Sequence, residues 1–115
     1  MMFYNCTALT SAPYLPATTL VNSCYAAMFE NCTSLTTAPV LPAIELDEYC
    51  YSEMFYGCTS LTNIEVAFTD WKTSNYATTN WVTNVGANGT FTKPNGLAAS
   101  TGDNFIPAGW TVINK

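Results

Sequence analysis

The sequence predicts a solenoid: about two and a half coils of short parallel strands and short helical turns, followed by a β-rich C-terminal cap. A block of 26 residues recurs from Met2, Met28 and Met54, and 15 of 26 positions are identical between the first two blocks. One copy has no second layer against which to bury its apolar side, so copies are expected to stack. After residue 68 the repeat fails, and the remaining chain carries all three Trp residues.

The chain therefore divides into two predicted parts. Residues 1–68 hold the repeats, as 2–27, 28–53 and a partial copy 54–68, and residues 69–115 form a Trp- and Gly-rich C-terminal cap. A stack of repeats needs a cover over its last apolar face, and Trp side chains are large enough to supply it. A separate ligand-binding module in the second part is the alternative. The start of the chain has no signal-peptide pattern, and we expect it to be a piece of a longer protein.

Each copy is predicted to contain one strand and one short helix. Residues 33–41 are expected to be extended, because Thr and Val are frequent there and Pro punctuates the segment. Residues 22–30 are expected to form about two helical turns, because Cys24 and Met28 are four positions apart. Pro39 has no amide to donate to a neighbouring coil, so the sheet is expected to be short.

One repeat position points to a special backbone conformation. The residue before the repeated Cys is Asn5, then Asn31, then Gly57. Asn and Gly share a tolerance for positive φ. We therefore expect a left-handed residue that ends the helical turn.

The C-terminal part carries hairpin signals. Residues 81–85 and 90–93 are predicted strands around the Gly-Ala-Asn-Gly sequence of residues 86–89, and residues 109–113 are a predicted closing strand.

Composition excludes several functions. The chain has no His and no Arg, and only three Lys residues. Catalysis by Ser-His-Asp or Cys-His and metal sites with His ligands are therefore excluded, and so is a basic nucleic-acid interface. No apolar run approaches the roughly 20 residues of a membrane span. We expect no enzyme and no cofactor, since no motif places a catalytic pair of carboxylates.

The five cysteines occupy two repeat positions, which favours buried free thiols. Cys6, Cys32 and Cys58 share one position, and Cys24 and Cys50 share the other. Cys behaves as a small apolar residue when it is buried. Disulfides and a thiolate metal site are the alternatives, although no Cys-x-x-Cys spacing is present. The acidic residues gather in the second repeat, where a solvated outer face is favoured over a calcium site.

The repeats resemble those of a known family. The Cys-x-x-Leu core of CTSLTTAP, the following Leu-Pro and the aromatic-rich CYSEMFYGC are similar to BspA-like leucine-rich repeats of bacterial surface proteins, in the 26-residue variant of gut bacteria or their phages. The resemblance covers residues 2 to about 68. It implies a leucine-rich-repeat solenoid, an extracellular or cell-surface location, and a non-catalytic binding or adhesion module with a host protein or a glycan as partner.

Two surfaces are predicted to carry function. Positions that vary between copies form a candidate recognition surface: Tyr4, Glu30, Tyr56, Thr37, Asn63 and Glu65. The first repeat carries no charge, and its open end forms a candidate self-association surface: Phe3, Leu9 and Leu20. The second surface favours an alternative function, a self-assembling structural protein such as an extracellular fibre or a phage tail component.

Overall fold

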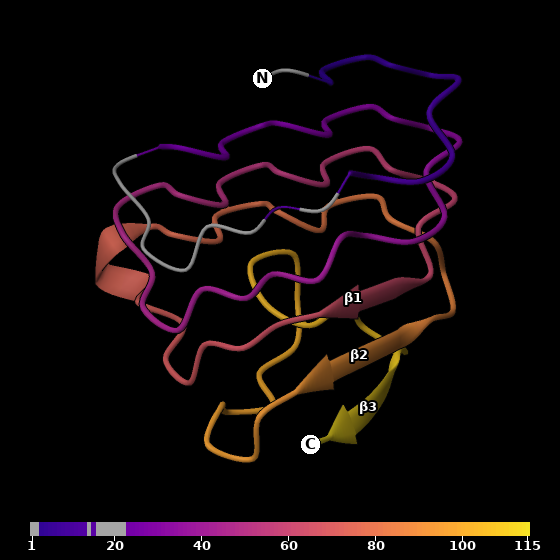
Figure 1. Ribbon diagram of the computed structural model, residues 1–115. Coiled ribbons are helices and arrows are strands. Elements are labelled where there is room, and N and C mark those ends of the chain that lie inside the picture. Colours follow the sequence, from indigo (N-terminus) through magenta and orange to yellow (C-terminus); the bar gives the residue numbers. More distant parts are fainter. Residues whose placement is uncertain (1–2, 14, 16–22) are drawn as a thin grey trace.

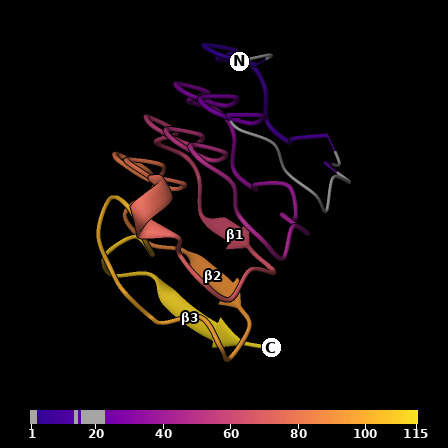
Figure 2. The same ribbon diagram turned by 90° about the vertical axis from the view of Figure 1, so that its left-hand side faces the viewer.

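The chain stacks in layers that follow one another from the N-terminal end to the C-terminal end (Figure 1, Figure 2). The computed structural model describes residues 3–13, 15 and 23–115. In these ranges the regular elements are three strands and one 3₁₀ helix: β1 (Asn63–Glu65), η1 (Thr73–Asn75), β2 (Thr90–Lys93) and β3 (Thr111–Asn114).

One side of each layer is a row of consecutive β-turns, here called a turn ribbon. The ribbons comprise residues 3–5, 23–31, 49–57 and 76–84 and lie above one another in Figure 1. Backbone amides along a ribbon alternate between two acceptors. The amide of Phe29 donates to the carbonyl of Met54 in the next layer at 3.0 Å, whereas the amide of Met28 closes a turn on Tyr25 at 3.2 Å. The ribbon therefore satisfies half of its amides internally and half through its neighbour.

The predicted leucine-rich-repeat solenoid with about two and a half coils and helical turns is wrong. Residues 22–30 were expected to be helical, but residues 23–30 form turns, and η1 is the one helix in the described ranges. Ser23 and Ala27 have φ of 57° and 54°, which a right-handed helix does not allow. In residues 69–115, β2 and β3 join β1 of the repeat region in a single three-stranded sheet.

The prediction of a left-handed residue before the repeated Cys is confirmed. Asn5, Asn31 and Gly57 have φ of 59°, 60° and 76°. They close the last turn of a ribbon and not a helix. A side chain at Gly57 would also collide with the Asn31 carboxamide, so Gly meets a steric need there as well.

The sheet is parallel, with the order β1-β2-β3, and Asn63, Thr90 and Thr111 lie opposite one another. Among the described residues, the earlier layers pair through isolated bridges, from Ser11 to Thr37, from Thr37 to Asn63 and from Leu41 to Val66. The repeat position of Pro13 and Pro39 is occupied by Glu65 in β1. Regular pairing begins only where that Pro is replaced, because Glu65 has the amide that Pro lacks.

The second layer accommodates one extra residue beside β1. Thr37 lies opposite Asn63, 26 positions on, whereas Leu41 lies opposite Val66, 25 positions on. Leu41 and Val66 are both fully buried, whereas Val40 is 45% exposed. The extra residue is therefore absorbed as a bulge that turns Val40 outward, while the apolar register is kept.

The predicted hairpin in the C-terminal part is wrong. Residues 81–84 belong to the last turn ribbon, and β2 pairs with β3 in parallel. The ribbon ladder continues past residue 68, with the amide of Phe55 donating to the carbonyl of Trp81 at 2.9 Å. The amide of Val82 then donates to the carbonyl of Asp103 at 3.2 Å, so that a loop partly covers the last ribbon.

A column of aromatic rings runs through the core from layer to layer. Phe3, Phe29 and Phe55 stack with centroid separations of 5.4 and 5.8 Å. Trp81 lies next at 5.9 Å in a tilted orientation. Phe29, Phe55 and Trp81 are fully buried, which makes this column the centre of the apolar core.

Candidate functional site

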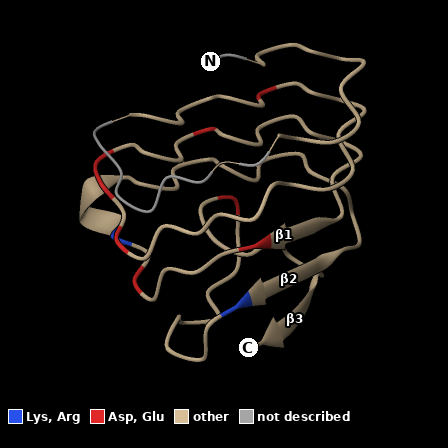
Figure 3. Cartoon of the chain, in the orientation of Figure 1, with Lys and Arg blue, Asp and Glu red and all other residues tan. Residues whose placement is uncertain are grey.

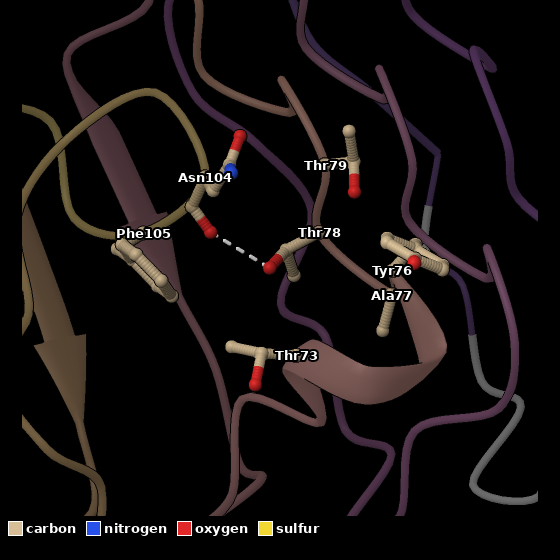
Figure 4. A pocket seen from close by; sticks show the side chains of 7 residues that line it. All are labelled: Thr73, Tyr76, Ala77, Thr78, Thr79, Asn104 and Phe105. Carbon is tan, nitrogen blue, oxygen red and sulfur yellow. Dashed lines mark hydrogen bonds between the residues drawn. The ribbon is translucent and has the colours of Figure 1, made fainter.

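A hollow of about 200 Å³ lies beside the last turn ribbon (Figure 4). Its lining is drawn from three segments. It consists of Thr73, Tyr76, Ala77, Thr78, Thr79, Asn104 and Phe105. Thr73 belongs to η1, the next four to the ribbon and its first turn, and the last two to the covering loop.

Two hydrogen bonds hold the covering loop against the ribbon. The Thr78 hydroxyl donates to the carbonyl oxygen of Asn104 at 2.7 Å (Figure 4). The amide of Asn80 donates to Oδ1 of Asn104 at 2.8 Å. With Oδ1 engaged in this way, the Nδ2 amino group is the remaining donor of the Asn104 side chain.

The amide of Thr78 points away from the preceding ribbon, to the side on which the described residues form no further ribbon. In earlier layers the matching amides, of Tyr25 and Tyr51, donate to the carbonyls of Cys50 and Ala77 at 3.1 and 2.9 Å. The Ala77 carbonyl points back toward Tyr51, so the N–H of Thr78 in the same trans peptide unit points the opposite way. Within the described residues the Thr78 amide has no acceptor. The ladder thus ends beside the hollow in a backbone donor without an acceptor among the described residues, on a residue that is 3% exposed.

Tyr76 gives the hollow an exposed aromatic wall. Its side chain is 55% exposed and stacks on Tyr49 of the preceding layer, with ring centroids 5.7 Å apart and planes at 16°. Because Tyr49 supports it, the Tyr76 ring holds its position without being buried.

The lining carries no charged side chain. Its polar groups are hydroxyls, the Asn104 amide and the open backbone donor. Lys72, next to η1, is engaged by Glu45 at 3.6 Å. Elsewhere the charged residues are distributed over the layers, and several acidic segments lie on the side of η1 (Figure 3). The lining of the hollow therefore offers hydrogen-bonding groups and no charged side chain.

The first three residues of the predicted recognition surface occupy one repeat position in successive layers, away from the hollow lining. Tyr4 is 40% exposed, and Glu30 and Tyr56 are partly exposed. Burial, together with the nearby charge of Glu53, raises the pKa of Glu30, and a hydrogen bond from Tyr4 opposes this shift. The three residues lie on one face, but the recognition role stays a prediction.

The other three predicted recognition residues lie on the sheet. Thr37 and Asn63 are exposed and face each other across a bridge. Glu65 is partly exposed and pairs with Lys115 at 2.7 Å. None of the three lines the hollow.

The predicted self-association residues are described in part. Phe3 and Leu9 are partly buried against the core, whereas Leu20 lies outside the described residues. The matching residues of the next layer, Phe29 and Leu35, are fully buried. The end layer therefore leaves apolar surface uncovered by the described residues.

The five cysteines are unpaired in the structure. Cys32, Cys50 and Cys58 are buried, and Cys6 and Cys24 are partly exposed. Burial raises the pKa of Cys50 to about 11 and that of Cys58 to about 12. Three or more potential metal ligands come together nowhere in the described ranges. No helix found in those ranges is both long and apolar enough to cross a membrane.

The repeat pattern of the sequence does not indicate the hollow. Residues 76–84 match residues 49–57 only when 27 positions, and not 26, separate them, and Trp81 then takes the place of Met54. The one usable signal was the spacing of Asn80 and Asn84, which have φ of 52° and 60° like Glu53 and Gly57. The contribution of Asn104 depends on a loop with no counterpart in the repeat.

Comparison with known proteins finds no match: neither a family model, nor a curated protein, nor a solved structure resembles the chain at a significant level.

Proposed function

We propose that the chain is a non-catalytic binding module and that the hollow beside the last turn ribbon is its ligand site. The proposal is carried by the amide of Thr78, which has no acceptor among the described residues. The matching amides of Tyr25 and Tyr51 each donate to a carbonyl of the next layer. A mostly apolar hollow with a few directed donors and one exposed aromatic ring is typical of a site that binds small ligands. The lining has no nucleophile beside a base, so it supports binding better than catalysis.

The stacked layers provide a rigid support for such a site. Each ribbon is fixed by bonds to the next, and the hollow lies where that series ends. An extracellular or cell-surface location is part of the proposal, and it rests on the resemblance of the repeats to those of bacterial surface proteins.

Binding can be tested without knowing the ligand. We would titrate ¹⁵N-labelled protein with separate sets of neutral, anionic and cationic small molecules and short peptides. The expected result is that at least one set shifts the amide signals of Thr78, Thr79 and Asn104. No shift of these signals with any set would refute the proposal.

A pair of variants makes this test specific. Thr78→Val removes the hydroxyl that holds Asn104 and should weaken the response about tenfold. Thr83→Val is the matched control, because the Thr83 hydroxyl is buried and has no hydrogen-bond partner within the described residues. Equal binding by both variants would show that the response comes from elsewhere.

Self-assembly is a second candidate, supported by the end layer. Phe3, Cys6 and Leu9 are only partly buried, whereas Phe29, Cys32 and Leu35 in the next layer are fully buried. A second copy of the chain would cover these side chains and complete the layer. Sedimentation velocity should then show concentration-dependent association that Leu9→Glu weakens. A chain that remains monomeric at high micromolar concentration would remove this candidate.

A further inference from the structure

We propose that the hollow binds a neutral carbohydrate, with one sugar ring against Tyr76 and its oxygens accepting hydrogen bonds from the Thr78 amide and the Asn104 amino group. This inference rests on the binding function proposed above and names the ligand class of that site.

The chemistry of the lining selects a neutral, oxygen-rich ligand. Thr73, Thr79 and Tyr76 offer hydroxyls, which donate and accept, while Thr78 and Asn104 offer N–H donors. No carboxylate or ammonium group lines the hollow. An ionic ligand would lose its hydration there without gaining a partner of opposite charge.

Tyr76 supplies an exposed aromatic face on which a sugar ring can pack. One face of a sugar ring presents C–H groups, and such a face packs on an aromatic ring. The Tyr76 ring is 55% exposed and supported by Tyr49. Burial of its remaining exposed surface by a ligand is favourable, whereas burial of an equally exposed hydroxyl cluster alone would not be.

The size of the hollow fits one ring of a sugar chain. Its volume of about 200 Å³ is below the roughly 300 to 1,000 Å³ of pockets that enclose drug-sized ligands. A single ring would occupy it while the rest of an oligosaccharide extends into solvent.

A peptide is a poorer fit for the backbone pattern. An extended peptide needs a run of alternating donors and acceptors along one edge. The amides two positions before and after Thr78 are already used, since Tyr76 donates to Thr73 and Asn80 donates to Asn104. One isolated donor suits a hydroxyl oxygen better than a peptide strand.

The test uses neutral oligosaccharides of glucose, mannose, galactose and N-acetylglucosamine, with uronic-acid oligosaccharides and uncharged peptides as separate arms. At least one neutral sugar should shift the amide signals of Thr78, Thr79 and Asn104. Tyr76→Ala should weaken its binding about tenfold, whereas Tyr76→Phe, which keeps the ring, should weaken it less than about threefold. Ile113→Ala on β3 is the control and should bind like the unmodified chain.

The outcomes separate this inference from the proposed function. Shifts at the hollow caused only by peptides or only by uronic acids would overturn the carbohydrate inference and leave the binding function standing. Sugar binding that survives Tyr76→Ala, in a variant whose spectrum is otherwise folded, would also overturn it. No response in any arm would overturn both.

Discussion

The thiol of Cys58 donates a hydrogen bond to the carbonyl oxygen of Phe29 in the preceding layer, over a distance of 3.0 Å. Cys32 bonds in the same way to Phe3 at 2.9 Å. The Cys at this repeat position is therefore both a small core residue and a link between layers, and Val85 takes this position in the fourth layer.

Replacing Cys58 should cost more stability than replacing Cys6. Cys58→Ala removes a fully buried side chain and its bond to Phe29, so the free energy of unfolding should fall by about 2 kcal/mol. Cys6→Ala, at the partly exposed position of the end layer, should cost less than about 1 kcal/mol. Urea unfolding measures both, and equal losses would contradict the linking role of Cys58.

The buried thiols should make the protein sensitive to alkali. Burial raises the pKa of Cys50 from 9.0 to about 11 and that of Cys58 from 9.0 to about 12. Above pH 9 the unfolded chain loses these protons while the folded chain keeps them. The free energy of unfolding should therefore be independent of these thiols below pH 9 and fall on the order of 3 kcal/mol per thiol as the pH rises toward their folded pKa values.

Thiol labelling checks the same feature at neutral pH. Cys50 and Cys58 should react slowly in the folded protein, and all five thiols should react after unfolding without reductant. Rapid labelling of Cys58 in the folded chain, or fewer than five reactive thiols after unfolding, would count against reduced, buried cysteines.

Glu30→Gln should stabilise the protein at neutral pH. Burial and the charge of Glu53 raise the pKa of Glu30 above its usual value of 4.5. The stability that protonated Glu30 gives is complete below pH 4.5 and is lost as the pH rises through the folded pKa. Gln removes this loss, so the variant should be slightly more stable at pH 7 and unchanged near pH 3, with a small gain because solvent screens a largely exposed carboxyl. Glu45→Gln, at a carboxylate that is 80% exposed, should show no such gain in thermal unfolding.

Lys93 should contribute more to stability than Lys115. The Lys93 side chain is 4% exposed, and its ammonium donates to the carbonyl of Leu97 at 2.8 Å and to Oδ1 of Asn114 at 2.7 Å. Lys93→Met keeps the apolar stem but leaves both acceptors unpaired, so a loss of about 2 to 3 kcal/mol is expected. Lys115→Met breaks only an exposed pair with Glu65 and should cost less than about 1 kcal/mol. Similar losses in urea unfolding would show that the buried bonds add nothing.

Tyr51→Phe should be neutral or stabilising by up to about 1 kcal/mol. The Tyr51 hydroxyl is buried and has no hydrogen-bond partner within the described residues. Its removal relieves the cost of a buried polar group while the ring keeps its stacking on Tyr25. A Tm lower than that of the unmodified chain would show that the hydroxyl has a partner after all.

Sequence reasoning succeeded where one residue type dictates the backbone. The exchange of Asn31 for Gly57 predicted positive φ, and Pro39 predicted a short sheet, because both rest on local sterics. It failed on the helices because a ribbon of turns also has a period of four. Cys24 and Met28 share a face for that reason, while every fourth residue is left-handed.

The site depends on information that spacing does not contain. Whether the Thr78 amide finds an acceptor is decided by where residues 103–105 lie, and these residues are distant in sequence. The proximity of Tyr76 to Tyr49 follows from a separation of 27 residues, one more than the repeat predicts. Because one residue is inserted, the fourth ribbon is out of register with the 26-residue repeat and does not appear in the sequence pattern.

The stack of ribbons has an electrical direction. Met28 C=O and Phe29 N–H belong to one peptide unit, and so do Ala77 C=O and Thr78 N–H, and in both units the carbonyl is turned toward the N-terminal layer. Dipoles aligned head to tail add, as they do along an α-helix, and leave partial positive charge at the end with open N–H groups. Each bond also polarises the bonds behind it. The hollow lies at this positive end, so a ligand oxygen there would be held by the field of the whole stack in addition to the one amide that it touches.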